Sequence, residues 1–142
     1  MRKILFFIYI LIFTNVLHAQ TTGIVGKWRT IDEQTGKAVS VVEIFEKHNK
    51  IYGRVIELIN SKVKNPKCEK CDGEDKNKPV LGLIVIKGLT KEKDEYQGKI
   101  LDPKHGKIYK CSLTLESKDK LKVRGYIGIE IFGRTQFWER VK

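Results

Sequence analysis

The sequence predicts an all-β fold, a small antiparallel β-barrel of about eight strands that follows a cleaved signal peptide. Short runs of β-branched and aromatic residues alternate with glycine-containing and polar turns from residue 26 onward. This region shows no convincing 3.6-residue period of an amphipathic helix. Consecutive short antiparallel strands protect their edges by closing into a barrel or folding into a sandwich, and we expect the barrel.

The first 19 residues have the order of a secretory signal peptide. Arg2 and Lys3 form a basic start, residues 4–17 are almost wholly apolar, and Ala19 offers a small residue for cleavage. The apolar run is shorter than the roughly 20 residues that a spanning helix needs, so we expect no transmembrane segment after cleavage. The sequence therefore predicts a periplasmic or secreted protein with a single domain at residues 20–142.

The expected strands follow one another along the mature chain, and Trp28 marks the first. The others are expected at residues 39–47, 51–59, 80–89, 96–101, 108–116, 121–127 and 132–141. Residues 108–116 alternate most strictly, with Tyr109 and Cys111 on the apolar face, so that face should be buried. His48 lies in the tight hairpin after the second strand, and we expect a turn residue there rather than a ligand.

Two neighbouring segments, residues 61–79 and 80–89, differ from the short strands and tight turns of the rest of the chain. Residues 80–89 are apolar on both faces, so a loop, a helix or a partner must cover the outer face. Residues 61–79 form a long polar loop, and its length makes it a candidate for function or for a covalent link.

Cys68 and Cys71 lie in this loop and admit three interpretations. A metal site needs four ligands, and the remaining candidates, Cys111, His48 and His105, are expected on a buried face or in turns. A redox site needs a stabilised thiolate. A disulfide suits an oxidising compartment and would contribute about 2 kcal/mol. We expect the Cys68–Cys71 disulfide with Cys111 as a buried thiol, although Cys111 could pair with either loop cysteine. We expect no metal and no cofactor.

The charge of the chain is strongly basic, with a formal net charge of +11. Cleavage of the signal would remove Arg2 and Lys3 and no acidic residue, leaving +9. The lysines are scattered singly, which is typical of a solvated surface rather than a nucleic-acid site, and we expect no nucleic acid. A basic exported protein could still meet anionic lipid, polysaccharide or acidic proteins.

Catalytic motifs are lacking in the sequence. It contains no nucleophile elbow, no H-E-x-x-H and no phosphate-binding glycine loop. Asp102 and Gly106 fit the first and closing positions of a type I turn, so His105 between them is expected to be a turn residue rather than a general base. The sequence favours a non-catalytic protein over an enzyme, with Trp28, Asp102, Gly106 and Tyr109 as structural residues.

The last strand carries polar residues on the face of a tryptophan. If Trp138 points inward, Arg134 and Gln136 go with it, and a buried arginine needs a partner such as Glu43. This arrangement is either a structural Arg134–Glu43 pair in a filled barrel or a polar anchor in a ligand pocket. Gly125, Gly128 and Gly133 could leave space for a ligand or merely permit strand bending and close packing. The candidate ligand-binding residues are Glu43, Arg124, Tyr126, Arg134, Gln136 and Trp138.

Several local strings occur in an order that resembles the domain of unknown function family 2147, exported bacterial proteins. They are Gly26-Lys27-Trp28, Asn65-Pro66-Lys67-Cys68 with Cys71, Pro79 followed by Leu81-Gly82, Asp102-Pro103 with Gly106-Lys107 and Tyr109, Val123-Arg124-Gly125-Tyr126 with Gly128, and Gly133-Arg134-Thr135-Gln136 with Trp138. The resemblance covers residues 26–142 and implies export and a compact β-rich domain, with no established activity. Glu130 departs from the family's pattern, in which that turn often holds a proline.

Gly26-Lys27-Trp28 at the first strand, with an arginine near the last, is also similar to the signature of lipocalin-like barrels. This second resemblance implies that Trp28 closes one barrel end and that an arginine packs across its ring, with Arg134 and Arg140 as candidates. It implies non-catalytic binding of a small apolar or lipid-like ligand. The alternatives are an envelope protein that uses its surface on a partner or a membrane, and a thiol–disulfide redox protein using Cys68 and Cys71.

Overall fold

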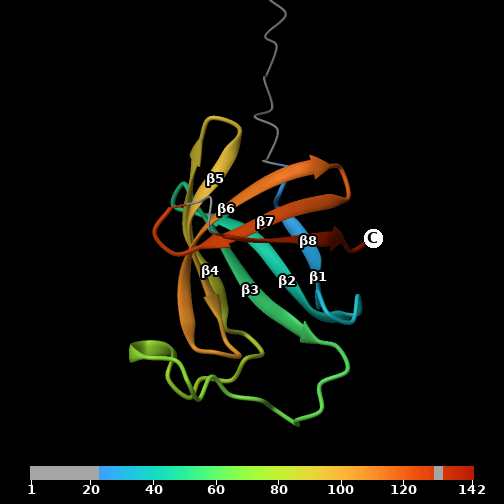
Figure 1. Ribbon diagram of the computed structural model, residues 1–142, viewed down its shortest axis with the longest axis vertical. Helices are drawn as coiled ribbons and strands as arrows, with labels where there is room; N and C mark the ends of the chain where they lie inside the picture. Colours follow the sequence, from blue (N-terminus) through green and yellow to red (C-terminus); the bar gives the residue numbers. More distant parts are fainter. Residues whose placement is uncertain (1–22, 130–132) are drawn as a thin grey trace, which may run out of the picture.

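The structure, a computed structural model, describes residues 23–129 and 133–142 as one closed antiparallel barrel (Figure 1). Within these ranges eight strands pair in sequence order, and the last pairs with the first. The strands are β1 (Gly26–Ile31), β2 (Ala38–Lys47), β3 (Lys50–Leu58), β4 (Ile84–Glu92), β5 (Glu95–Asp102), β6 (Lys107–Ser117), β7 (Lys120–Tyr126) and β8 (Arg134–Arg140). The predicted all-β barrel is confirmed.

The described residues contain one short 3-10 turn, η1 (Gly73–Asp75), and no helix with the length and apolar character needed to cross a bilayer. The predicted signal peptide, residues 1–19, lies outside the described residues, as do Glu130 and Phe132.

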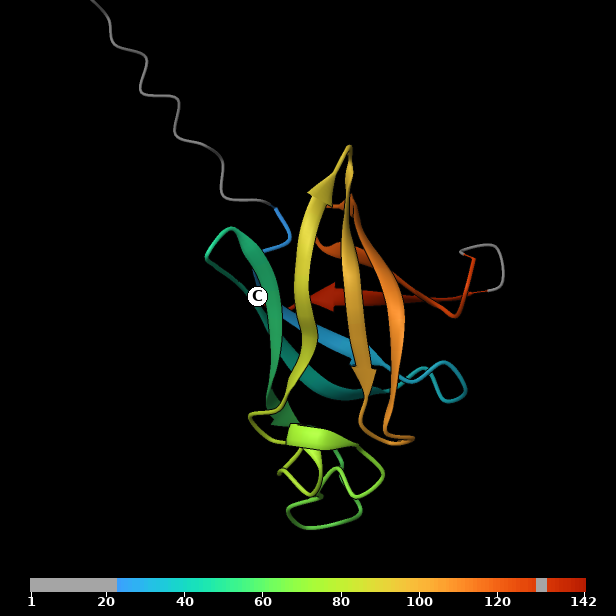
Figure 2. The ribbon, with the colours of Figure 1, turned by 90° about the vertical axis from the view of Figure 1, so that its left-hand side faces the viewer.

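The two ends of the barrel differ in their connections. Three two-residue turns, β2–β3, β4–β5 and β6–β7, lie at one end, which we call the closed end. His48 and Asn49 form the first of these turns with φ of 51° and 61°, which confirms the predicted hairpin. The longer connections β1–β2, β3–β4, β5–β6 and β7–β8 lie at the other end, which we call the mouth end (Figures 1 and 2).

The interior is most tightly filled in the half near the closed end. Trp28, Leu89 and Leu113 are fully buried there. Gly53 and Gly98 allow the chains to approach closely: a Cβ at Gly53 would lie 2.8 Å from Ile86 Cδ1, and a Cβ at Gly98 would overlap the Leu89 side chain. These glycines leave no empty space, because branched side chains of β4 occupy it.

The predicted strand at residues 80–89 has wrong bounds. β4 runs over Ile84–Glu92, and residues 80–83 belong to the β3–β4 loop. The expected cover on its outer face is this loop. Lys87 Nζ on the outer face lies 2.7 Å from Asp75 Oδ2 in the loop, and Val85 on the same face is 5% exposed. The apolar outer residues of β4 are therefore buried within the chain itself.

Candidate functional site

The closed end is sealed by Trp28 and Arg140. The Trp28 ring is fully buried, and Arg140 Cζ lies 4.2 Å from its centroid. Arg140 Nε donates to the Lys118 carbonyl at 2.7 Å, and Nη1 donates to the Val25 carbonyl at 3.2 Å. Of the two predicted arginines, Arg140 is the one that stacks on Trp28.

The inner wall of the mouth half around Gly125 is packed less tightly than the closed half around Gly53 and Gly98. Gly125 follows the buried Val123 on the inner face of β7. A Cβ at Gly125 would meet only Tyr109 Cβ at 3.8 Å and Ile100 Cγ2 and Lys110 O at 4.0 Å, which are ordinary contacts. Ile100 and Tyr109 are themselves only partly buried. The inner wall at this point is apolar and accommodates an added group.

A few polar groups border this apolar wall. Thr30 Oγ1 and Ser40 Oγ lie 2.6 Å apart between β1 and β2. On β8, Trp138 Nε1 donates to Gln136 Oε1 at 3.4 Å, and Arg134 lies exposed at the mouth, paired with Gly125 in the sheet. An apolar cavity with a small number of fixed polar groups is the usual character of a small-molecule site.

The structure brings together three of the six predicted ligand-binding residues. Arg134, Gln136 and the buried Trp138 share the inner face of β8. Arg124 and Tyr126 alternate with the inward Val123 and Gly125, so they lie on the outer face of β7, where Arg124 Nη1 donates to Thr135 Oγ1 at 2.6 Å. These two side chains do not line the interior.

The predicted Arg134–Glu43 pair is wrong. Glu43 points out of the barrel, and its Oε1 lies 3.0 Å from Arg54 Nη2 on the neighbouring strand. The inward residues of β2 are Val42 and Ile44, at 2% and 1% exposed. The pairing of β2 with β3 shifts register between Val41 and Val42, and Glu43 lies outside because it alternates with the inward Val42 and Ile44.

Residues 102–106 form a turn as predicted, but it closes with an i→i+4 hydrogen bond and not with the i→i+3 bond of a type I turn. Asp102 Oδ1 accepts from the Lys104 N–H at 2.9 Å, and the Gly106 N–H donates to the Asp102 carbonyl at 2.8 Å. His105 Nδ1 lies 2.6 Å from Asp102 Oδ2 on the exposed surface, so this histidine belongs to the turn. Tyr109 follows on the inner wall of the mouth half.

The Cys68–Cys71 disulfide is confirmed, with the two Cα atoms 5.3 Å apart. Both residues are buried, at 0% and 1% exposed, and thiol–disulfide exchange needs an accessible sulfur. The bond therefore suits a structural link better than a redox centre. Cys111 is a free thiol inside the barrel, and burial raises its pKa to about 12.

The β3–β4 loop lies against the β5–β6 turn (Figure 2), and the disulfide is located at this contact. Cys68 Sγ lies 3.5 Å from the Pro103 carbonyl oxygen. A Cβ at Gly106 would lie 2.6 Å from the Cys71 nitrogen and would overlap the Lys70 carbonyl. The backbone of the β5–β6 turn at Gly106 therefore contacts the backbone of the β3–β4 loop, and only glycine permits this close approach.

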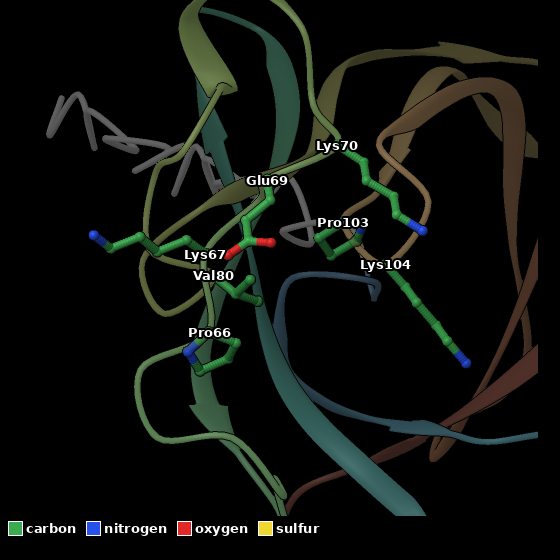
Figure 3. A pocket seen from close by; sticks show the side chains of 7 residues that line it. All are labelled: Pro66, Lys67, Glu69, Lys70, Val80, Pro103 and Lys104. Atoms are coloured by element: carbon green, nitrogen blue, oxygen red, sulfur yellow. The ribbon is translucent and has the colours of Figure 1, made fainter.

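A surface pocket of about 330 Å³ lies at the same junction (Figure 3). Its lining residues are Pro66, Lys67, Glu69, Lys70, Val80, Pro103 and Lys104. In Figure 3, Lys67 extends away from Lys70 and Lys104, while the Glu69 carboxylate lies among them. Lys67 therefore points away from the other two lysines, and the one acid of the lining, Glu69, offsets part of their charge.

The closed eight-stranded barrel with a Trp–Arg seal at one end defines a lipocalin-like protein. Its fold matches protein HP1028 from the human pathogen Helicobacter pylori, which belongs to the lipocalin family. The match has a TM-score of 0.71 and 25% identity, and it covers 83% of this chain and 82% of that chain.

The amino-acid sequence shows which family the chain belongs to. Residues 26–140 match DUF2147, described as an uncharacterized protein conserved in bacteria, and the chain belongs to this family. No curated protein matches the sequence significantly.

Sequence reasoning missed several inner residues of the mouth half as candidates. Ile100, Thr30 and Ser40 carry no distinctive motif, and their role depends on which strands face each other across the barrel. The one usable signal was alternation: Ile100 lies an even number of residues from Tyr96 and Gly98, which share its face.

Proposed function

We propose that this protein is exported and binds a small apolar or lipid-like ligand, without catalysis, in the mouth half of its barrel. The observation that carries the proposal is the contrast between the two halves. Side chains overlap the space beside Gly53 and Gly98, whereas an added group beside Gly125 meets its neighbours at ordinary contact distances. A barrel that is tightly packed at one end and less tightly packed at the other is suited to one small ligand.

The wall chemistry favours an amphiphile. Ile100 and Tyr109 offer apolar surface to a hydrocarbon body, and Arg134 at the rim offers a guanidinium to an acidic head group. Gln136, one layer deeper on β8, supplies a carboxamide for a hydroxyl or carbonyl group. The lipocalin family of the H. pylori protein supports the proposal, although a shared fold alone does not establish a shared ligand.

Filling the mouth tests the site directly. The probe is a fluorescent fatty acid titrated into purified protein that has been delipidated under denaturing conditions and refolded. Gly125→Leu is expected to weaken binding at least tenfold, because the added side chain occupies the space of the ligand. Thr114→Leu on the outer face of β6 is the matched control and should bind like the unmodified protein. Unchanged binding by a folded Gly125→Leu protein would refute the site.

The head-group preference has its own experiment. Arg134→Ala is expected to weaken binding of the fatty acid about fivefold, the scale of one partly exposed charge-assisted hydrogen bond, and to leave the corresponding neutral alcohol unaffected. An equal loss for acid and alcohol would show that Arg134 shapes the mouth without contacting the head group.

Export is tested by the mass of the protein recovered from the periplasm of a bacterial host. Cleavage after Ala19 leaves a chain that begins at Gln20. A cytoplasmic protein of full-length mass would contradict the export part of the proposal.

A further inference from the structure

The outer wall of the barrel at the mouth end carries a row of lysines. Lys87 on β4 pairs in the sheet with Lys99 on β5, and Lys99 pairs with Lys110 on β6. Like charges directly opposite each other on one sheet face are destabilising. Asp75 neutralises Lys87 at 2.7 Å.

Lys99 and Lys110 have no such neutralising partner. Both are exposed, and no carboxylate of residues 23–129 or 133–142 lies within ion-pair distance of either. Their mutual repulsion is therefore retained in the folded protein, and an external anion would relieve it.

Exposed isoleucines occur at the mouth end of β6 and directly after β7, whose Tyr126 pairs in the sheet with Lys110. Ile108 pairs in the sheet with Leu101 and shares the outer face with Lys110. The β3–β4 loop leaves Leu101 only 3% exposed, but Ile108 is 52% exposed. Ile127 and Ile129, which follow β7 at the same end, are 69% and 60% exposed. Large apolar side chains grouped with bare lysines are uncommon on a surface that meets only water.

We propose that Lys99, Lys110, Ile108, Ile127 and Ile129, here called the lysine–isoleucine face, dock the protein on an anionic lipid bilayer. The bilayer is the one partner that offers both anionic head groups for the lysines and an apolar layer beneath them for the isoleucines. The net charge of +9 that remains after removal of residues 1–19 adds long-range attraction to such a surface. The face adjoins the mouth, so a docked barrel presents its opening to the lipid.

Vesicle binding tests the lysine half of the face. The full mature protein is mixed with vesicles of phosphatidylcholine alone and of phosphatidylcholine with phosphatidylglycerol, and the bound fraction is measured by sedimentation. Binding is expected on the anionic vesicles and much weaker on the neutral ones. Lys99→Ala/Lys110→Ala should weaken it about 25-fold, about fivefold for each lysine near the surface. Lys47→Ala/Lys50→Ala removes the same charge at the closed end and should cost less than threefold.

Variants of the exposed isoleucines distinguish an anionic bilayer from a soluble anionic polymer. Ile127→Ser/Ile129→Ser is expected to weaken vesicle binding about tenfold, since less apolar surface leaves water, whereas Val39→Ser/Val63→Ser, which changes two other exposed residues, should not. Soluble polyglutamate should bind more weakly than the vesicles.

Three results would overturn the assignment: no binding to anionic vesicles, equal losses in the lysine variant and its control, or full binding by the isoleucine variant. Tighter binding of polyglutamate would assign the face to an acidic macromolecule instead. Gly125→Leu should dock like the unmodified protein, so failure of docking and failure of ligand uptake are separable.

Discussion

Arg140 concentrates several contacts of the closed end in one side chain. Its guanidinium stacks on Trp28 and donates to the carbonyls of Lys118, Val25 and Gly23. Arg140→Ala removes the stacking and leaves these carbonyls without their donor, so the free energy of unfolding should fall by about 2 kcal/mol. Chemical denaturation measures this.

Arg140→Lys serves as the control, because it keeps a cation near the ring but cannot reach all three carbonyls. It should lose about half as much stability. An Arg140→Ala protein as stable as the original would show that the seal depends on Trp28 alone.

Cys111 gives the stability of the barrel a pH dependence in the alkaline range. Burial raises the pKa of its thiol from 9.0 to about 12. Above pH 9 the unfolded chain loses this proton while the folded chain keeps it, so the contribution is fully present below pH 9 and is lost as pH rises toward 12. The loss should approach about 1.4 kcal/mol per pH unit.

Comparing the unfolding free energy of the original protein with that of Cys111→Ala isolates this thiol from the other groups that titrate there. The difference between the two proteins should shrink as pH rises through the range. A constant difference from pH 8 to pH 11 would argue that the thiol ionises freely in the folded state.

Individual residues could be predicted from sequence where one residue type fits one role. Trp28 beside Gly26 and a late arginine pointed to the seal. Glu43 could not be placed, because β2 is apolar on both faces. Its outer Phe45 is accommodated by stacking on Tyr52 at 5.9 Å and by Arg54 at 5.2 Å from the ring centroid. Only the sheet partners decide which face turns inward.

Among the elements, the contact between the β3–β4 loop and the β5–β6 turn should depend on Gly106. The residue has φ of 67°, and a Cβ there would overlap the Lys70 backbone. Gly106→Ala should lower the unfolding free energy by about 3 kcal/mol or detach the loop, since backbone cannot rotate away as a side chain can.

Gly36→Ala is the matched control, with φ of 68° and no atom within 4 Å of the added Cβ. It should cost only about 1 kcal/mol from the left-handed backbone. Thermal unfolding and limited proteolysis of the loop give both readouts. Similar losses at the two positions would mean that the loop contact adds little.

Relief of the repulsion within the lysine row on β4, β5 and β6 should stabilise the barrel slightly. Lys110→Glu replaces repulsion of Lys99 by attraction, and the unfolding free energy should rise by about 0.5 kcal/mol at low salt. The gain should shrink in 1 M salt. Lys122→Glu is the control, because its sheet partners are the uncharged Thr114 and Phe137.

A rise in stability together with weaker vesicle binding would separate a docking defect from a folding defect. If Lys110→Glu instead destabilised the barrel, the lysines would not be repelling each other, and the physical argument for an external anion at this face would lose its basis.

Strand positions were largely predictable because alternation is a local property. The strand predicted at residues 108–116 lies within β6, at Lys107–Ser117. The strand predicted at residues 80–89 had wrong bounds, although its two-sided apolar pattern correctly indicated a cover on its outer face, which the disulfide loop supplies. Val85 and Leu101 join the two cysteines in one buried cluster. Such cover is a tertiary contact that a strand's own residues do not encode.

At the scale of the whole molecule, the barrel combines a tightly packed closed end with a mouth end whose inner wall is only partly buried. The short turns, the Trp28–Arg140 seal and the filled half supply stability. The longer connections, the partly buried inner wall and the lysine–isoleucine face all lie toward the other end. Sequence analysis could predict a barrel but not this polarity, since the polarity follows from which glycines are filled by branched side chains of neighbouring strands.

The polarity predicts opposite outcomes for the same substitution at two inner glycines. Gly98→Ala should lower the unfolding free energy by about 2 kcal/mol or more, because the new methyl overlaps the Leu89 side chain and lies 3.1 Å from the Leu89 Cα. Gly125→Ala should be neutral or stabilising by up to about 1 kcal/mol, since alanine restricts the unfolded chain and its methyl fits at 3.8 Å or more. Denaturant unfolding of both proteins without ligand compares the two halves independently of any binding assay. Equal destabilisation would mean that the mouth half is packed like the closed half, and the ligand site would then have to lie elsewhere.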